Sequence, residues 1–142
     1  MNDTQTLVSA PLGDSLATHL ADKIRTKTAK VGVIGLGYVG LPLAVEYGKA
    51  GFHVTGIDVS TRKVEQLNQG ISYVQDVPTA EVEELVRAGR LTATTNFEVI
   101  RELDTVNIAV PTPLRKTKDP DMSFVVAAAQ EVAKYAHKGL LV

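Results

Sequence analysis

Residues 31–58 read VGVIGLGYVGLPLAVEYGKAGFHVTGID, and this stretch decides the fold. It predicts a strand over residues 31–35, a helix over about residues 38–49 and a second strand over residues 53–58. The turn GLGYVG joins the first strand to the helix. Pro42 falls in the first helical turn, where a proline is tolerated because that position needs no N–H partner. This order is typical of a doubly wound α/β sheet.

Each glycine of the turn has its own predicted task. Gly35 permits the tight turn out of the strand, Gly37 lets the main chain approach a diphosphate, and Gly40 lets helix and strand pack closely. The free N–H groups at the start of the helix, together with the positive end of the helix dipole, favour an anion there. We therefore predict a dinucleotide-binding site.

The acid at the end of the second strand indicates which dinucleotide binds. The carboxylate of Asp58 is expected to accept hydrogen bonds from the adenosine ribose hydroxyls. A 2′-phosphate would meet a like charge there, which favours NAD over NADP, although Arg62 and Lys63 just downstream would soften that repulsion. FAD is a rival for the same geometry, but a FAD enzyme of this type would need further segments.

The composition narrows the class of protein. The chain has 142 residues, 44% of them hydrophobic, with 15 basic and 16 acidic side chains and no cysteine. One core is expected, with no charge signature for nucleic acid or an anionic membrane. The lack of cysteine excludes disulfides and thiol chemistry from these residues. Because neither a signal-peptide pattern nor a membrane-spanning apolar run occurs, we expect a cytoplasmic protein.

The rest of the sequence continues the alternation of strands and helices. Residues 1–11 are expected to form a flexible tail, and residues 12–142 a single Rossmann-type domain that opens with an amphipathic helix capped by Asp14 or Ser15. Further helices are predicted within residues 60–68, 71–90, 97–103 and 123–137, and further strands over residues 91–95, 105–110 and 140–142.

The C-terminal part carries two further expectations. The helix over residues 123–137 is predicted to bury one face, formed by Val125, Ala129, Val132 and Ala136. The last strand stops after three residues, so we expect a doubly wound parallel sheet truncated at strand five, as in a piece of a longer enzyme.

Three segments together resemble one known family. VGVIGLGYVGLPLA (31–44), GIDVSTRKVEQLNQG (56–70) and AVPTPLRKTKDPDMSFV (109–125) are similar to the N-terminal NAD-binding domain of the UDP-glucose/GDP-mannose 6-dehydrogenase family. The resemblance runs from about Lys30 to Val142 and is nearest to the UDP-N-acetylglucosamine or UDP-N-acetylmannosamine 6-dehydrogenase branch. GYVGLP and VPTP, in this order and separation, are much rarer than the bare glycine pattern.

The resemblance implies an activity and a set of site residues. The family oxidises the C6 alcohol of a nucleotide sugar to a carboxylate with two NAD, through a cysteine-bound thioester, in polysaccharide precursor synthesis. UDP-sugar would be the partner of the full-length enzyme, which would also be a homo-oligomer. No catalytic residue or metal ligand is expected in this chain, which should be inactive alone. The cofactor-binding residues would be Gly35, Gly37, Tyr38, Val39, Gly40, Asp58, Lys63, Pro111 and Thr112.

Other interpretations stay open at this point. The chain could be a domain of a 3-hydroxyacid-type dehydrogenase, whose turn usually reads GxMG, or a stand-alone NAD-binding module. The ring of Tyr38 could pack against the protein and not meet a ligand, Lys63 could be an ordinary solvated helix residue, and the Thr112 hydroxyl could only stabilise a turn.

Overall fold

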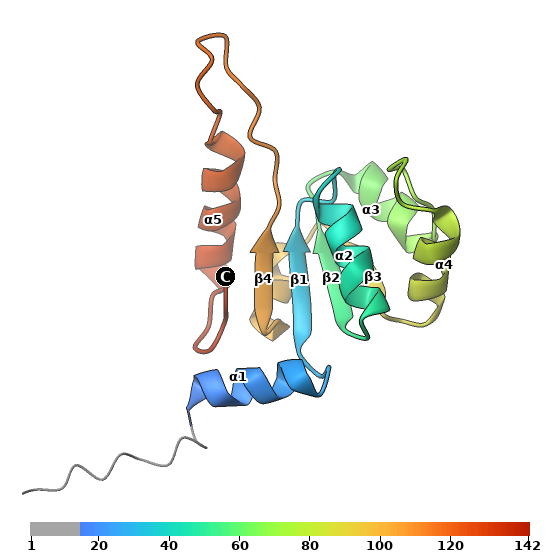
Figure 1. Cartoon of the computed structure of the whole chain (residues 1–142). Coiled ribbons are helices and arrows are strands. Elements are labelled where there is room, and N and C mark those ends of the chain that lie inside the picture. The colour runs from blue at the N-terminus through green and yellow to red at the C-terminus, as the bar shows by residue number, and fades with distance from the viewer. Residues whose placement is uncertain (1–14) are drawn as a thin grey trace, which may run out of the picture.

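The structure, a computed structural model, describes residues 15–142 and has a parallel sheet at its centre (Figure 1). The strand order is β3-β2-β1-β4, and each neighbouring pair is parallel. This is the order of a Rossmann-type sheet and confirms the predicted fold class. The expected tail, residues 1–11, and the possible cap Asp14 lie outside the described residues. The strands are β1 (Lys30–Ile34), β2 (His53–Ile57), β3 (Leu91–Thr94) and β4 (Thr105–Ile108).

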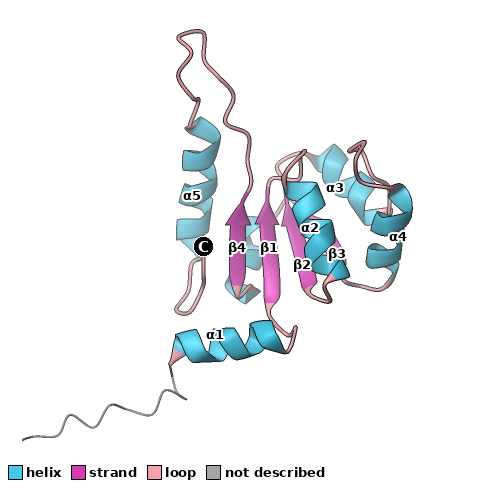
Figure 2. Ribbon diagram, viewed as in Figure 1, coloured by secondary structure: helices cyan, strands magenta, loops and turns pink. Residues whose placement is uncertain are grey.

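The helices follow the predicted order (Figure 2). The predicted short helix after β3 is a 3-10 helix, η2. None of the helices in residues 15–142 is long and apolar enough to cross a membrane. The helices are α1 (Leu16–Arg25), α2 (Gly40–Lys49), α3 (Thr61–Asn68), α4 (Thr79–Arg87), η2 (Phe97–Glu102) and α5 (Ser123–Tyr135).

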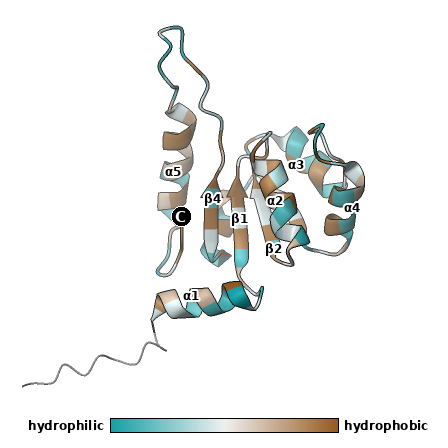
Figure 3. Cartoon of the chain, in the orientation of Figure 1, coloured by the Kyte–Doolittle hydropathy of each residue, from teal (hydrophilic) through white to brown (hydrophobic). Residues whose placement is uncertain are grey.

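The sheet buries apolar side chains on both faces, because successive residues of a strand point to opposite sides. Val31 and Val33 of β1 belong to the core beneath α2, α3 and α4, whereas Ile34 belongs to a second core with η2 and α5. Figure 3 shows hydrophobic residues on β1 and on the helices α2 and α5. A parallel sheet covered on both faces needs such apolar strands.

Helix α5 buries Val132, as predicted, and Val125 is half-buried, but the prediction fails at the two alanines of that face. Ala128 and Val132 are its buried residues, while Ala129 and Ala136 are exposed. Ala136 also lies outside the helix, in extended backbone. The prediction was wrong because the run VVAAA is apolar on every side, so the sequence pattern does not select a face. The packing of α5 against η2 and β4 selects it.

The last residues of the chain lie beside β4, at the outer edge of the sheet. Leu141 forms a parallel bridge with Thr105. The N–H of Val106 donates to the carbonyl of Leu141 at 2.8 Å, and the N–H of Leu141 donates to the carbonyl of Asp104 at 3.1 Å. This is the position that a fifth strand takes in the predicted order.

Helix α1 crosses the end of the sheet opposite the glycine turn (Figure 1). Ser15 caps it by accepting a hydrogen bond from the N–H of Thr18 at 3.1 Å. Asp104 connects the helix to the sheet: Oδ1 accepts from Lys23 Nζ and Oδ2 accepts from the N–H of Lys30, both at 2.8 Å. One carboxylate therefore fixes the end of α1 and the start of β1.

The ionisation of Asp104 is coupled to this contact. Burial alone would raise the pKa of Asp104, but the hydrogen bonds from Lys23 and Lys30 and the charges of these two lysines outweigh burial and hold the pKa below its usual 3.8. A carboxyl group whose pKa is lowered on folding stabilises the fold above its unfolded pKa, and that stability is lost as the pH falls through the folded pKa.

We predict that Asp104→Asn lowers the free energy of unfolding by about 1 kcal/mol at about pH 7, because it removes a partly buried charged hydrogen bond. The difference from wild type should shrink as the pH falls below the usual carboxyl pKa. Urea unfolding at several pH values measures both effects. Asp22→Asn, which removes an exposed partner of Arg25 within α1, is the matched control and should change stability little. A pH-independent loss in the Asp104 variant would contradict the assignment.

Candidate functional site

A cleft of about 670 Å³ opens at the carboxyl ends of the parallel strands. Its walls come from the ends of β1 and β2, from the residues that follow β3 and β4, and from the inner side of α5. In open α/β sheets this is the edge at which ligands bind. The lining includes Ile34, Gly35, Ile57, Asp58, Lys63, Phe97, Val110, Pro111, Phe124, Ala128, Glu131 and Tyr135.

The three glycines of the turn meet different surroundings. Gly35 has a φ of +92°, and a Cβ atom there would lie 2.6 Å from the carbonyl oxygen of Ala109. A Cβ atom at Gly40 would overlap the carbonyl oxygen of Gly35. At Gly37, by contrast, a Cβ atom would find no atom of the described residues within 4 Å apart from those of its chain neighbours. The fold therefore requires the first and third glycines, and Gly37 faces open space.

The start of α2 leaves main-chain donors free. The helix begins at Gly40, two residues later than predicted, and its N-cap Val39 makes no side-chain capping bond. Leu41 donates to the carbonyl of Gly37 at 3.1 Å, but within residues 15–142 the N–H groups of Tyr38 and Val39 have no acceptor. Such free groups at a helix N-terminus suit an anionic ligand such as a diphosphate.

The side chains beside these donors do not cover them. Tyr38 is 85% exposed and Val39 is 68% exposed. The interpretation in which the ring of Tyr38 packs against the protein is therefore wrong. The turn presents both its main chain and its side chains to the outside.

Asp58 is a buried carboxylate held by main-chain N–H groups. It is 9% exposed, and it accepts hydrogen bonds from Leu36 through Oδ2 and from Ser60 through Oδ1, each at 2.8 Å. A carboxylate oxygen can accept more than one hydrogen bond, so both oxygens keep capacity for a ligand hydroxyl. The sequence did not reveal that Asp58 also fixes the glycine turn.

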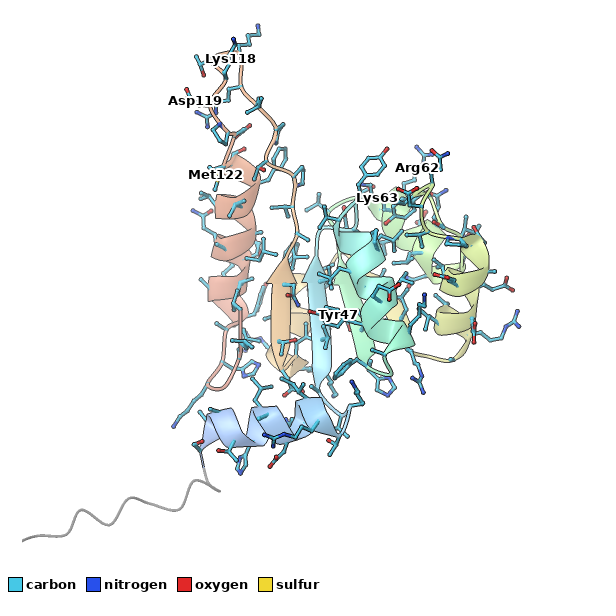
Figure 4. All side chains as sticks on the ribbon, viewed as in Figure 1. Tyr47, Arg62, Lys63, Lys118, Asp119 and Met122 are labelled. Carbon is cyan, nitrogen blue, oxygen red and sulfur yellow. The ribbon has the colours of Figure 1, made fainter. Side chains whose placement is uncertain are left out.

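Lys63 lies on α3 and lines the same cleft. Its Nζ is 6.0 Å from the centre of the Tyr73 ring. Figure 4 places Arg62 and Lys63 at the end of the molecule at which the glycine turn lies. Lys63 is thus placed to attract a polyanion at the cleft, whereas Arg62 is not among the residues that line it.

Of the two cofactor-binding residues predicted after β4, Pro111 and Thr112, the structure places only the first in the cleft. The strand ends at Ile108, before the predicted Val110, and Pro111 lines the cleft. Thr112 is exposed and is not among the residues that line the cleft. It lies in the loop of residues 111–122, which projects beyond the sheet and carries Lys118 and Asp119 at its tip (Figure 4).

Sequence reasoning missed the contribution of the C-terminal helix to the cleft. Phe124, Glu131 and Tyr135 of α5 all line it. The spacing of Tyr135 from the buried Ala128 and Val132 is the signal that could have found this face, because the three lie along one side of a helix. No group of three or more metal-ligand side chains occurs among the described residues.

Comparison with known proteins agrees with this geometry. Residues 29–142 match the model of the UDP-glucose/GDP-mannose dehydrogenase family, NAD binding domain. The chain is 40% identical over 116 residues to a UDP-N-acetyl-D-glucosamine 6-dehydrogenase of Pseudomonas aeruginosa, covering 82% of this chain and 26% of that protein. A UDP-N-acetyl-D-mannosamine dehydrogenase of Salmonella typhi is 39% identical over 113 residues, covering 79% of this chain and 26% of that protein.

A solved structure shows the same fold. The NDP-N-acetyl-D-galactosaminuronic acid dehydrogenase of Methanosarcina mazei Go1 superposes with a TM-score of 0.77 at 35% identity, covering 89% of this chain and 29% of that chain. The present chain therefore spans about a quarter of the length of the relatives it matches.

The contrast between the glycines gives a stability test. Gly40→Ala should lower the free energy of unfolding by about 1–3 kcal/mol or more, because the added methyl group forces α2 away from the carbonyl of Gly35. Gly37→Ala is the matched control, since its methyl group meets no protein atom and should leave stability nearly unchanged. Urea unfolding measures both variants. Equal stability of the two would show that the close approach of α2 to the turn is not needed.

Proposed function

The chain belongs to the UDP-glucose/GDP-mannose dehydrogenase family, of which it is the NAD-binding domain, and on that premise we propose where it holds NAD and what the whole protein does. In this proposal the diphosphate of NAD rests on the turn of residues 35–40 and the adenosine ribose on Asp58. Lys63 and Pro111, which line the same cleft, complete the proposed binding residues, and a contact from Thr112 stays a prediction. The observation that carries the proposal is the open space at Gly37 beside the unpaired N–H groups of Tyr38 and Val39.

The diphosphate site is proposed to be made of main chain. Unpaired N–H groups at a helix start bind an anion without a basic side chain. In this proposal a side chain at Gly37 would occupy the space that the diphosphate takes. The absence of any protein atom near that position supports a ligand there, because nothing in the fold itself requires a glycine at Gly37.

The ribose site is proposed to select NAD. The carboxylate of Asp58 lines the cleft and keeps lone pairs for the two ribose hydroxyls. A 2′-phosphate would add a dianion beside this carboxylate, and the partial compensation by Arg62 and Lys63 would leave a net penalty. NADP should therefore bind more weakly than NAD.

The activity of the whole protein is proposed from its relatives. The two relatives above are named as dehydrogenases of UDP-N-acetyl-D-glucosamine and UDP-N-acetyl-D-mannosamine. We propose that the full-length enzyme oxidises the C6 alcohol of a UDP-N-acetylhexosamine to a carboxylate with two NAD. The present 142 residues contain no cysteine, so a thiol nucleophile would have to come from elsewhere. The cytoplasmic location and the homo-oligomer stay predictions.

Gly37→Ala tests the cofactor site directly. Its methyl group would clash with a bound diphosphate, so NAD affinity should fall about tenfold or more while the unfolding free energy stays near that of wild type. Calorimetric titration with NAD measures the affinity, and urea unfolding checks the fold. If Gly37→Ala bound NAD as tightly as wild type does, the diphosphate would have to lie elsewhere.

The choice of cofactor gives a second test. Titration of wild type with NAD and NADP should show NAD binding about tenfold more tightly at low salt, because of the like charges at Asp58. Asp58→Asn should narrow this preference, and at the same time it should weaken the binding of NAD itself. A preference for NADP in wild type would overturn the assignment of Asp58.

A third test concerns the reaction. The 142-residue chain should form no NADH from NAD and UDP-N-acetylglucosamine or UDP-N-acetylmannosamine, whereas the full-length protein should form two NADH per sugar oxidised. Absorbance of NADH follows both reactions. NADH formation by the 142-residue chain alone would contradict the proposal that the nucleophile lies outside these residues.

A further inference from the structure

The connection between α3 and α4, residues 69–78, makes one hydrogen bond to the glycine turn. The hydroxyl of Tyr73 donates to the carbonyl oxygen of Leu36 at 2.6 Å. Nothing in the sequence pattern assigns a task to this connection beyond lengthening the crossover from β2 to β3. This hydrogen bond therefore links the connection to the turn at the candidate diphosphate site.

The connection is itself held firmly. Val74 and Val77 are each 5% exposed and belong to the core beneath α2, α3 and α4. The hydroxyl of Ser72 donates to the carbonyl of Val74 at 3.0 Å, and the N–H of Ser72 donates to the hydroxyl of Thr79 at 3.2 Å. Tyr73 thus projects toward the turn from a fixed base, so its position does not depend on a ligand.

Leu36 is hydrogen-bonded through main-chain groups on both sides of its α-carbon. Its N–H donates to Asp58 and its carbonyl accepts from Tyr73. Its side chain is fully buried, and a Cβ atom added at Gly56 would lie 2.7 Å from it. With three points fixed, the peptide planes that lead into residues 37–39 have a fixed direction.

The carbonyl of Leu36, to which Tyr73 donates, is also the expected acceptor of a hydrogen bond within helix α2. In a regular helix the N–H of residue i donates to the carbonyl of residue i−4, so the partner of Gly40 would be Leu36. The structure gives that carbonyl to Tyr73, and Gly40 makes no such bond within the described residues. Helix α2 therefore begins without a hydrogen bond to the carbonyl of Leu36, and the N–H groups of Tyr38 and Val39 have no acceptor within residues 15–142.

The Tyr73 hydroxyl also keeps its proton. Burial, and after it the nearby charge of Asp58, raises the pKa of Tyr73 well above its usual value of 10. The hydroxyl is accordingly a hydrogen-bond donor at any physiological pH.

We propose that Tyr73 is a positioning residue of the diphosphate site, which holds the main chain of the glycine turn in the orientation that binds a diphosphate. The inference rests on the proposed function, since it presumes that this turn receives the diphosphate of NAD. Tyr73 touches no ligand in this role and acts through Leu36. Loss of its hydroxyl would let the carbonyl of Leu36 turn toward Gly40 and would misdirect the free N–H groups.

The test compares the affinities of Tyr73→Phe and wild type for two ligands, ADP and adenosine, which share the nucleoside but of which only ADP carries a diphosphate. Affinity for ADP should fall about three- to tenfold, the scale of one buried hydrogen bond, while affinity for adenosine stays within about twofold of wild type. NMR titration of the 142-residue chain measures both constants under one set of conditions. A merely structural role would lower both affinities alike.

Tyr47→Phe is the matched control. Tyr47 lies on α2 (Figure 4), packs edge-on against Phe52 with ring centres 6.2 Å apart, and has a hydroxyl that makes no hydrogen bond within residues 15–142. The same change of atoms there should leave both affinities unchanged.

Each outcome of these titrations supports or overturns the positioning role of Tyr73 or the proposed function. Unchanged ADP affinity in Tyr73→Phe, or an equal loss for ADP and adenosine, overturns the positioning role. If wild type itself binds neither ADP nor adenosine, the proposed function fails first and independently of Tyr73. A selective loss of ADP affinity, absent in Tyr47→Phe, supports the inference.

Discussion

The contact on which the rest depends is the one between Gly40 and the carbonyl of Gly35. Because no side chain separates them, helix α2 starts directly against the end of strand β1. That close approach directs the free N–H groups of the helix toward the carboxyl edge of the sheet, where the cleft opens. It also leaves no room for any residue other than glycine at that position, so the site and the fold share one steric requirement.

A second feature is that one side chain serves both structure and ligand. Asp58 accepts hydrogen bonds from the N–H groups of Leu36 and Ser60, and within residues 15–142 it forms no salt bridge, so the main chain stabilises its charge. Hydrogen bonds to a buried carboxylate are among the stronger ones in proteins. The same carboxylate that would bind the ribose therefore ties the end of β2 to the glycine turn. With Tyr73 on the other side, both the N–H and the carbonyl of Leu36 are hydrogen-bonded within the protein.

Particular residues show which features of the fold and the site can be predicted from the sequence. Gly35, Ser60 and Gly70 each mark a turn or a helix boundary because their local conformations have strong residue preferences, whereas Gly40 is required by its contact with the carbonyl of Gly35. The buried face of α5 could not be predicted from its apolar run, and the prediction erred at Ala129 and Ala136. The exposed position of Thr112 was likewise not evident, because it depends on the course of the whole loop that follows β4.

The sequence by itself determined the order of strands and helices, the place of the glycine turn and the acid beside it, because these follow from local conformational preference and periodicity. Only the tertiary structure decided which side of α5 faces the cleft, that Asp58 accepts from the N–H of Leu36, and that Tyr73 reaches the carbonyl of the same residue. Those contacts join residues far apart along the chain, and no local preference encodes the distance between two segments once the core has packed.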